Sequence, residues 1–144
     1  MDIDFGSGGI NINDVLLTKE SLVADVIKAG CVYHSEYDDW LNYSTVQNIF
    51  GLVASLTIRF KANRLVMIDF VFKQGDGLQE DDYPTEEALL AEKDSLSQKV
   101  TQAIGMGPTA STLSANTYAF DWGIISVSAN LSSLMCFLSI RYAK

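Results

Sequence analysis

The chain has few of the residues that carry most enzyme chemistry. Among its 144 residues there is one histidine, His34, and there are two cysteines, Cys31 and Cys136. A Ser-His-Asp or Cys-His arrangement would have to use His34, and the sequence has no nucleophile elbow, phosphate-binding lysine loop or HExxH motif. The cysteines are far apart and have apolar or aromatic neighbours, which is typical of buried thiols in a reducing compartment. We therefore expect no enzyme activity, no metal and no cofactor.

Long apolar runs are also missing. No run approaches the ~20 residues needed to cross a bilayer. The acidic start, residues 1–5, lacks the basic and apolar regions of a secretory signal. Hydrophobic residues make up 48% of the chain and charged residues 19%, which is typical of a globular protein. We expect one domain spanning residues 1–144, in the cytoplasm and away from membranes.

Positive charge is scarce, and negative charge is concentrated in one segment. Ten Lys and Arg face 18 Asp and Glu, and residues 74–94 hold eight of the acids with a single lysine, so that this segment carries −7 of the net −8. Such a field should repel nucleic acid and anionic lipid and steer a basic partner toward the protein. The alternative is that these acids serve solubility and, at Glu86 and Glu87, the start of a helix. The run lacks the DxDxDG spacing of a calcium loop.

Two helices are expected from apolar periodicity and capping residues. The first has Thr18 as its N-cap, runs over residues 19–29 and stops at Gly30. The second follows Pro84 and Thr85, continues to residue 104 and is closed by Gly105. The Gly6-Ser7-Gly8-Gly9 run lacks the lysine of a phosphate loop and predicts a flexible turn.

Most of the remaining chain alternates apolar and polar residues, which predicts strands. Residues 54–60 and 66–72, joined by the turn 61–64, should form an antiparallel hairpin with one buried face. A second hairpin is expected from residues 118–122 and 134–142, with a bulge after Gly123 where the apolar phase slips. Weaker strand signals cover residues 9–12, 32–36 and 41–49. The expected fold is α+β: a meandering antiparallel sheet with the two main helices packed on one face.

Residues 33–43 combine four aromatic side chains with three carboxylates. Tyrosine and tryptophan are common anchors of protein interfaces, and nearby carboxylates suit a basic partner. The alternative is that Tyr33, Tyr37 and Trp40 pack at a sheet edge or under the first helix. Met135 and Phe137, in the last strand, point opposite to the buried series. They are either covered by a helix or exposed as a patch for a homodimer or partner contact.

Three parts of the chain resemble a known class of small bacterial proteins. These are the hairpin with Phe50-Gly51, Arg59-Phe60-Lys61 and Arg64-Leu65-Val66, the helix exit Gly105-Met106-Gly107-Pro108, and Phe120–Ser126 leading to Ile140-Arg141-Tyr142. The pattern is similar to that of immunity proteins, which neutralise antibacterial toxins delivered by type VI secretion or contact-dependent systems. It spans roughly residues 15 to 142. The resemblance implies a small, non-catalytic, cytoplasmic α+β domain, and it assigns no functional residue.

These observations predict a binding protein that neutralises a cognate toxin or effector by covering a basic active site. The expected contact residues lie in an acidic loop and in an aromatic segment: Asp76, Glu80, Asp81 and Asp82, with Tyr37, Asp38, Asp39, Trp40 and Tyr43. One alternative is an acidic secretion or folding chaperone that holds an effector through apolar surface. Others are a carboxylate-based hydrolase that uses His34 and a structural subunit of a larger assembly.

Overall fold

The computed structural model describes residues 3–72 and 85–143, and these residues form mainly β-structure. The strands that precede the long helix are β1 (Ile3–Asp4), β2 (Gly9–Ile12), β3 (Val15–Leu17), β4 (Val32–Tyr37), β5 (Trp40–Ile49), β6 (Leu52–Lys61) and β7 (Arg64–Phe72). Those that follow it are β8 (Ala110–Ser111), β9 (Ala115–Phe120), β10 (Gly123–Asn130) and β11 (Met135–Tyr142). The helices of the described residues are α1 (Val23–Lys28) and α2 (Glu86–Ile104).

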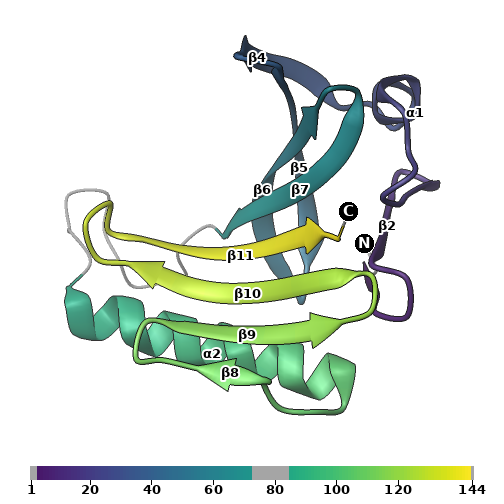
Figure 1. Cartoon of the computed structure of the whole chain (residues 1–144). Coiled ribbons are helices and arrows are strands. Elements are labelled where there is room, and N and C mark those ends of the chain that lie inside the picture. Colours follow the sequence, from purple (N-terminus) through teal and green to yellow (C-terminus); the bar gives the residue numbers. More distant parts are fainter. Residues whose placement is uncertain (1–2, 73–84, 144) are drawn as a thin grey trace.

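The strands form two antiparallel sheets. The small sheet has the order β1-β2-β3, and the large sheet has the order β4-β5-β6-β7-β11-β10-β9-β8. Strand β11 pairs with β7, so the end of the chain joins the two meanders into one sheet. Figure 1 shows that the strands change direction sharply between β7 and β11, as expected of a strongly twisted sheet. The edges of the large sheet are β4 and β8.

One face of the large sheet is the core face. Alternate residues of its central strands are buried, as the period-two pattern predicts: Ala54, Leu56, Ile58 and Phe60 on β6, Ile68, Phe70 and Phe72 on β7, Cys136, Leu138 and Ile140 on β11, and Ile125 and Val127 on β10. Helix α2 covers β10 and β11 on this face and contributes Leu96 and Val100 to the same cluster. Each such side chain contributes roughly 1.5–3 kcal/mol through burial.

The small sheet closes the other end of the core face. Its buried residues Ile10, Ile12 and Leu17 belong to the same apolar cluster. Two hydrogen bonds tie it to the large sheet: the Trp122 indole donates to the Phe5 carbonyl at 2.8 Å, and the Tyr142 hydroxyl donates to the Gly8 carbonyl at 2.8 Å. Residues 5–8 form the expected turn. This turn is tightly packed, because a Cβ on Gly8 would lie 2.5 Å from the Trp122 ring.

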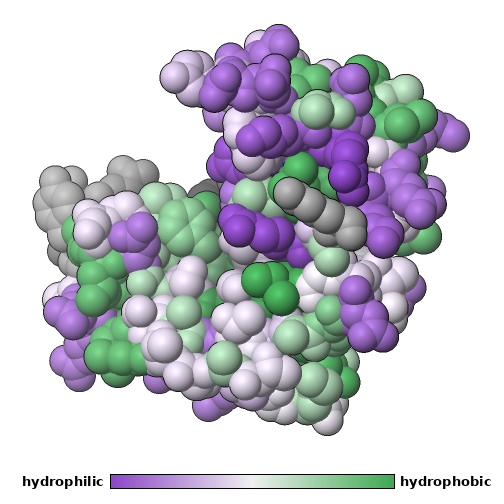
Figure 2. Space-filling view, viewed as in Figure 1, coloured by the Kyte–Doolittle hydropathy of each residue, from purple (hydrophilic) through white to green (hydrophobic). Residues whose placement is uncertain are grey.

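The opposite side of the large sheet, which we call the open face, is polar and partly exposed. One cross-strand row contains five hydroxyl residues and one carboxylate: Ser44, Thr57, Asp69, Ser139, Ser126 and Thr117. Figure 2 shows a pale surface over β9–β11 and more strongly hydrophilic residues over the β4–β7 half. Met135, 37% exposed, and half-buried Phe137 lie on this side, whereas α2 packs against the core face. Of the two alternatives for these residues, coverage by a helix is therefore wrong for the described helices.

The predicted α+β fold, with two main helices on one face of a sheet, is wrong. Helix α2 is the one described helix longer than six residues, and α1 packs mainly against β3 of the small sheet. The first helix is short because a turn competes with it: the Ser21 hydroxyl accepts from the Thr18 amide at 2.8 Å, and the Ser21 amide donates to the Thr18 carbonyl. The helix begins at Val23, where the Asp25 carboxylate accepts from the Leu22 amide.

Other expectations are confirmed, with two corrections. The 54–72 hairpin is β6–β7, and the weaker strand signals correspond to β2, β4 and β5. Helix α2 follows Pro84 and Thr85 as predicted, with Thr85 as its N-cap, and it is closed by Gly105 with φ 85°. The predicted hairpin of residues 118–122 with 134–142 is wrong, because β10 lies between β9 and β11 and pairs with both. In place of the predicted bulge after Gly123, the chain reverses at Asp121-Trp122, where Phe120 pairs with Gly123, and this reversal explains the change of apolar phase. Neither helix in residues 3–72 and 85–143 is both long and apolar enough to cross a membrane.

Candidate binding site

The β4–β5 hairpin carries most of the predicted contact residues that the structure describes. Its turn is formed by Asp38 and Asp39, which both have positive φ (47° and 68°), the conformation that two-residue hairpin turns require and that aspartate tolerates. Both carboxylates are exposed. Tyr37 is 80% exposed and pairs across the hairpin with half-buried Trp40. The hairpin tip therefore presents an aromatic ring next to two acids.

The other predicted contact residues differ in position. Tyr43 is buried and meets Tyr33 edge to face, with ring centroids 6.1 Å apart, so it packs within the hairpin. Trp40 has the Lys61 Nζ 5.3 Å from its ring centroid. The acidic-loop residues Asp76, Glu80, Asp81 and Asp82 lie outside the described residues. Of the three residues that the packing alternative named, Trp40 is half-buried, whereas Tyr33 and Tyr37 are exposed. Tyr43, which was predicted as a contact residue, is buried.

A pocket of about 390 Å³ lies on the open face beside this hairpin. It is lined by residues of four neighbouring strands: Tyr37 of β4, Trp40 and Asn42 of β5, Arg59 of β6, and Met67 and Asp69 of β7. The strand order explains the grouping, because Asn42, Arg59 and Met67 occupy one cross-strand row. We call this feature the open-face pocket.

A hydrogen-bonded network fixes the polar wall of the open-face pocket. The Arg59 Nε donates to Asp69 Oδ2 at 2.7 Å, and the Ser139 hydroxyl donates to Asp69 Oδ1 at 2.7 Å. The Arg59 Nη1 lies 3.5 Å from Asn42 Oδ1, and Asn42 Nδ2 donates to the Ser35 hydroxyl at 3.1 Å. The Arg59 side chain is 35% exposed, so the ion pair adds at most about 1 kcal/mol to stability. Its main effect is to hold the guanidinium in one orientation.

The charge around this pocket differs from the charge of the whole chain. Lys61 pairs with Arg64 at the end of the β6–β7 hairpin, and Arg141 follows Met67 in the same cross-strand row as Arg59. Sequence reasoning missed Arg59 and Asp69 as site residues. Their signal was a pair of opposite charges at polar positions of two strands predicted to form a hairpin, which places them on the same face.

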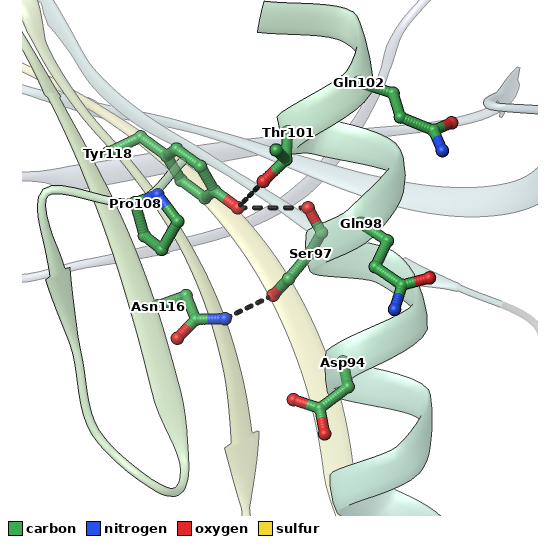
Figure 3. Close-up of a pocket in the computed structure, with 8 residues that line it drawn as sticks. All are labelled: Asp94, Ser97, Gln98, Thr101, Gln102, Pro108, Asn116 and Tyr118. Carbon is green, nitrogen blue, oxygen red and sulfur yellow. Dashed lines mark hydrogen bonds between the residues drawn. The ribbon is translucent and has the colours of Figure 1, made fainter. Parts of the chain in front are cut away.

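A second, polar pocket of about 410 Å³ lies between α2 and β9 (Figure 3). The Tyr118 hydroxyl lies 2.8 Å from the Thr101 hydroxyl and 3.0 Å from the Ser97 carbonyl, and Asn116 Nδ2 donates to the Ser97 hydroxyl at 2.9 Å. These bonds attach the helix to the sheet, so the hydroxyls of Thr101 and Tyr118 already have partners. We interpret this pocket as the seam between α2 and β9.

Few described groups are suited to nucleophilic chemistry. Burial raises the pKa of the Cys31 thiol, and burial together with the Glu92 charge raises the pKa of Cys136 to about 12, although Lys93 lowers it in part. Neither thiol is therefore activated at neutral pH. His34 lies exposed on β4 at the point where the register with β5 shifts. Among residues 3–72 and 85–143, no three His, Cys, Asp or Glu side chains are grouped so that they could hold a metal ion.

Comparison with known proteins adds no relative. No model of a protein family, no curated protein and no solved structure matches this chain.

Proposed function

We propose that this chain is a non-catalytic binding protein that neutralises a toxin or effector protein in the cytoplasm by covering its active site. The observation that carries the proposal is the hairpin tip, where Tyr37 is 80% exposed beside the exposed carboxylates of Asp38 and Asp39. Covering an exposed aromatic side chain with a partner surface is favourable, because the ring leaves water. The adjacent carboxylates favour a partner with cationic groups.

The charge distribution of the sequence supports the same class of partner. Residues 74–94 carry −7 of the net −8, and such a field accelerates the approach of a cationic surface. A nuclease is a natural target, because its phosphate-binding groove is cationic and an acidic inhibitor reproduces the field of the substrate. The resemblance to immunity proteins points in the same direction.

The test is growth rescue. The gene immediately upstream is expressed in bacteria alone and together with this chain, and surviving colonies are counted. We expect toxicity that wild-type protein abolishes. The triple variant Tyr37→Ala, Asp38→Asn, Asp39→Asn should lose most of the rescue. A matched control that removes an exposed apolar residue and two exposed acids elsewhere, Leu113→Ala, Asp14→Asn and Asp121→Asn, should keep it. A harmless upstream product, or full rescue by the hairpin variant, would contradict the proposal.

The steering of the toxin by the acidic segment is tested separately. A variant with Asp76→Asn, Glu80→Gln, Asp81→Asn and Asp82→Asn should associate with the toxin more slowly and show a weaker dependence on salt. Unchanged association rates across a salt series would exclude steering by the acidic segment while leaving the hairpin contact in place.

One feature favours the chaperone as a second candidate. Val46 is 64% exposed and Val53 42% exposed, and both lie on the open face with Met135 and half-buried Phe137. An apolar surface of this kind suits a protein that holds an unfolded effector or forms a dimer. A chaperone would dimerise and would tolerate the four amide substitutions in the acidic segment. Sedimentation of the pure protein separates the two candidates.

A further inference from the structure

We propose that the open-face pocket binds a small aromatic oxyanion, that is, a molecule with a carboxylate or phosphate next to a flat ring. The pocket's volume, about 390 Å³, is within the range of small-molecule sites, and it combines apolar walls with a few oriented polar groups. This inference goes beyond toxin neutralisation and does not depend on it. It rests on Arg59, Arg141 and Trp40, which the neutralisation variants leave unchanged.

Arg59 provides the donors for the oxyanion. Its contacts with Asp69 and Asn42 among the described residues use two of the five N–H groups of a guanidinium, and its side chain is 35% exposed. A guanidinium held in place by a carboxylate loses little conformational entropy when it binds a second oxyanion. Pairing with planar carboxylate or phosphate oxygens is also the strongest hydrogen bonding available to this side chain.

The same network disfavours a cationic ligand. Asp69 is the one carboxylate that lines the pocket, and both of its oxygens already accept hydrogen bonds, from Arg59 and from Ser139. An ammonium or guanidinium group would have to compete with these donors and would meet the positive charge of Arg59. The hydrogen-bonding groups on this wall of the pocket therefore favour a ligand that accepts hydrogen bonds over a ligand that donates them.

Neighbouring charges of both signs surround the pocket. Arg141 lies next to Met67 in the cross-strand row, with its Nη2 4.0 Å from the Met67 sulfur, and Lys61 lies over the Trp40 ring. Asp38 and Asp39 lie in the turn that follows Tyr37. All four of these charged residues are exposed, so water and salt screen them. The preference for an anion therefore rests mainly on the Arg59 guanidinium, with a smaller contribution from Arg141 in the same row.

The aromatic residues account for the ring of the ligand. Trp40 and Tyr37 form the hairpin side of the pocket, and Met67 lies on the β7 side. Flat rings stack on aromatic faces, and the methionine sulfur is a favourable neighbour of a ring edge. A charge alone would leave these apolar groups in water, and a ring alone would make no use of the Arg59 N–H groups that Asp69 and Asn42 leave available. We therefore expect binding to require both parts.

Nuclear magnetic resonance titration of the ¹⁵N-labelled full chain tests the proposal directly. Phenyl phosphate and phenylacetate are the probes. Inorganic phosphate and acetate supply charge without a ring, and 2-phenylethanol supplies a ring without charge. We expect the Arg59 Nε–H and Trp40 indole signals to shift saturably with the two probes, with a Kd on the order of 1 mM for molecules of this size. The Trp122 indole, which donates to the Phe5 carbonyl, is an internal control and should not move.

Variants identify the groups responsible. Arg59→Gln should weaken phenyl phosphate binding at least tenfold, and Arg141→Gln about threefold. Lys28→Gln removes the same charge from an exposed site on α1 and should keep the Kd within twofold of the wild-type value. If Arg59→Gln does not fold, Arg141→Gln and Trp40→Leu carry the test, because neither changes the Arg59–Asp69 pair.

Three results would overturn the proposal. They are equal binding of 2-phenylethanol and phenyl phosphate, shifts that do not include Trp40 and Arg59, and an unchanged Kd in the Arg141→Gln and Trp40→Leu variants. In each case the pocket would be a gap between strands with no preference for an anionic ring.

Discussion

At the scale of single residues, two glycines show how backbone conformation and the space around a Cβ atom limit which side chain a position accepts. Gly123 begins β10 directly after the Asp121-Trp122 turn, with φ 153°, and a Cβ built there would lie 2.1 Å from the Arg141 carbonyl oxygen of the paired strand. Gly51 also has positive φ, 75°, but a Cβ there meets no atom within 4 Å. Comparing substitutions at the two glycines therefore separates the stability cost of a steric overlap from the stability cost of a side chain at positive φ.

We predict that Gly123→Ala lowers the free energy of unfolding by at least about 3 kcal/mol, because β10 and β11 must move apart to admit the methyl group. Gly51→Ala should cost about 1 kcal/mol, the ordinary penalty for an L-residue at positive φ. Urea denaturation followed by tryptophan fluorescence measures both. Equal losses would mean that the close approach to Arg141 does not constrain the strand pair.

At the scale of elements, local capping chemistry explains why one predicted helix formed over its full length and the other did not. The Thr85 hydroxyl accepts from the Ala88 amide at 3.0 Å, which is an N-cap bond. Thr18 has the same chemistry, but its hydroxyl accepts from the Glu20 amide at 3.3 Å within a turn. Residues 19–22 therefore lie outside the helix, which begins at Val23.

We predict that Thr85→Ala destabilises the protein by about 1 kcal/mol, the usual loss for an N-cap bond. Thr18→Ala is the matched control, and it should cost less than about 0.5 kcal/mol because Thr18 does not cap a helix. Thermal and urea unfolding of the two variants under the same conditions give the comparison. If Thr18→Ala lowered the free energy of unfolding as much as Thr85→Ala does, Thr18 would be a helix cap and the prediction would be wrong.

At the scale of the whole molecule, one apolar cluster joins both sheets and α2, and the two cysteines lie at different places in it. Cys31 follows α1 and is 8% exposed, whereas Cys136 lies in β11 and is 4% exposed. Both thiols are free. Burial raises the pKa of each thiol and also shields it from reagents. A thiol therefore ionises and reacts only when the fold opens around it.

We predict that N-ethylmaleimide at pH 7.5 labels both thiols at least about a hundredfold more slowly in the native protein than in urea, because labelling must wait for local or global unfolding. Cys136 should be the slower of the two, since it is less exposed and its pKa is raised to about 12. Mass spectrometry of peptides over a time course provides the measurement. Rapid native labelling of Cys136 would show that β11 opens easily.

Sequence reasoning identified strands well where the alternation was strong, and it identified α2 with its closing Gly105. It failed at Thr18, where a turn and a helix share the same first hydrogen bonds, and at Gly123, where a reversal and a bulge both shift the apolar phase. For the candidate site it found Tyr37 and Trp40 from composition. It could not find Arg59 and Asp69, because their meeting depends on the register of β6 with β7 and on the position of Ser139 in β11.

By itself, the sequence determined the buried face of each strong strand, the extent of α2 and the segment that holds the negative charge, because these follow from local periodicity and from composition. Only the tertiary structure decided that β11 inserts beside β7, that Arg59 and Asp69 meet in a pocket on the open face, and that Tyr37 faces water while Tyr43 does not. These outcomes depend on contacts between residues far apart in the chain, such as Asp69 with Ser139, and no local pattern encodes which distant strands will pair.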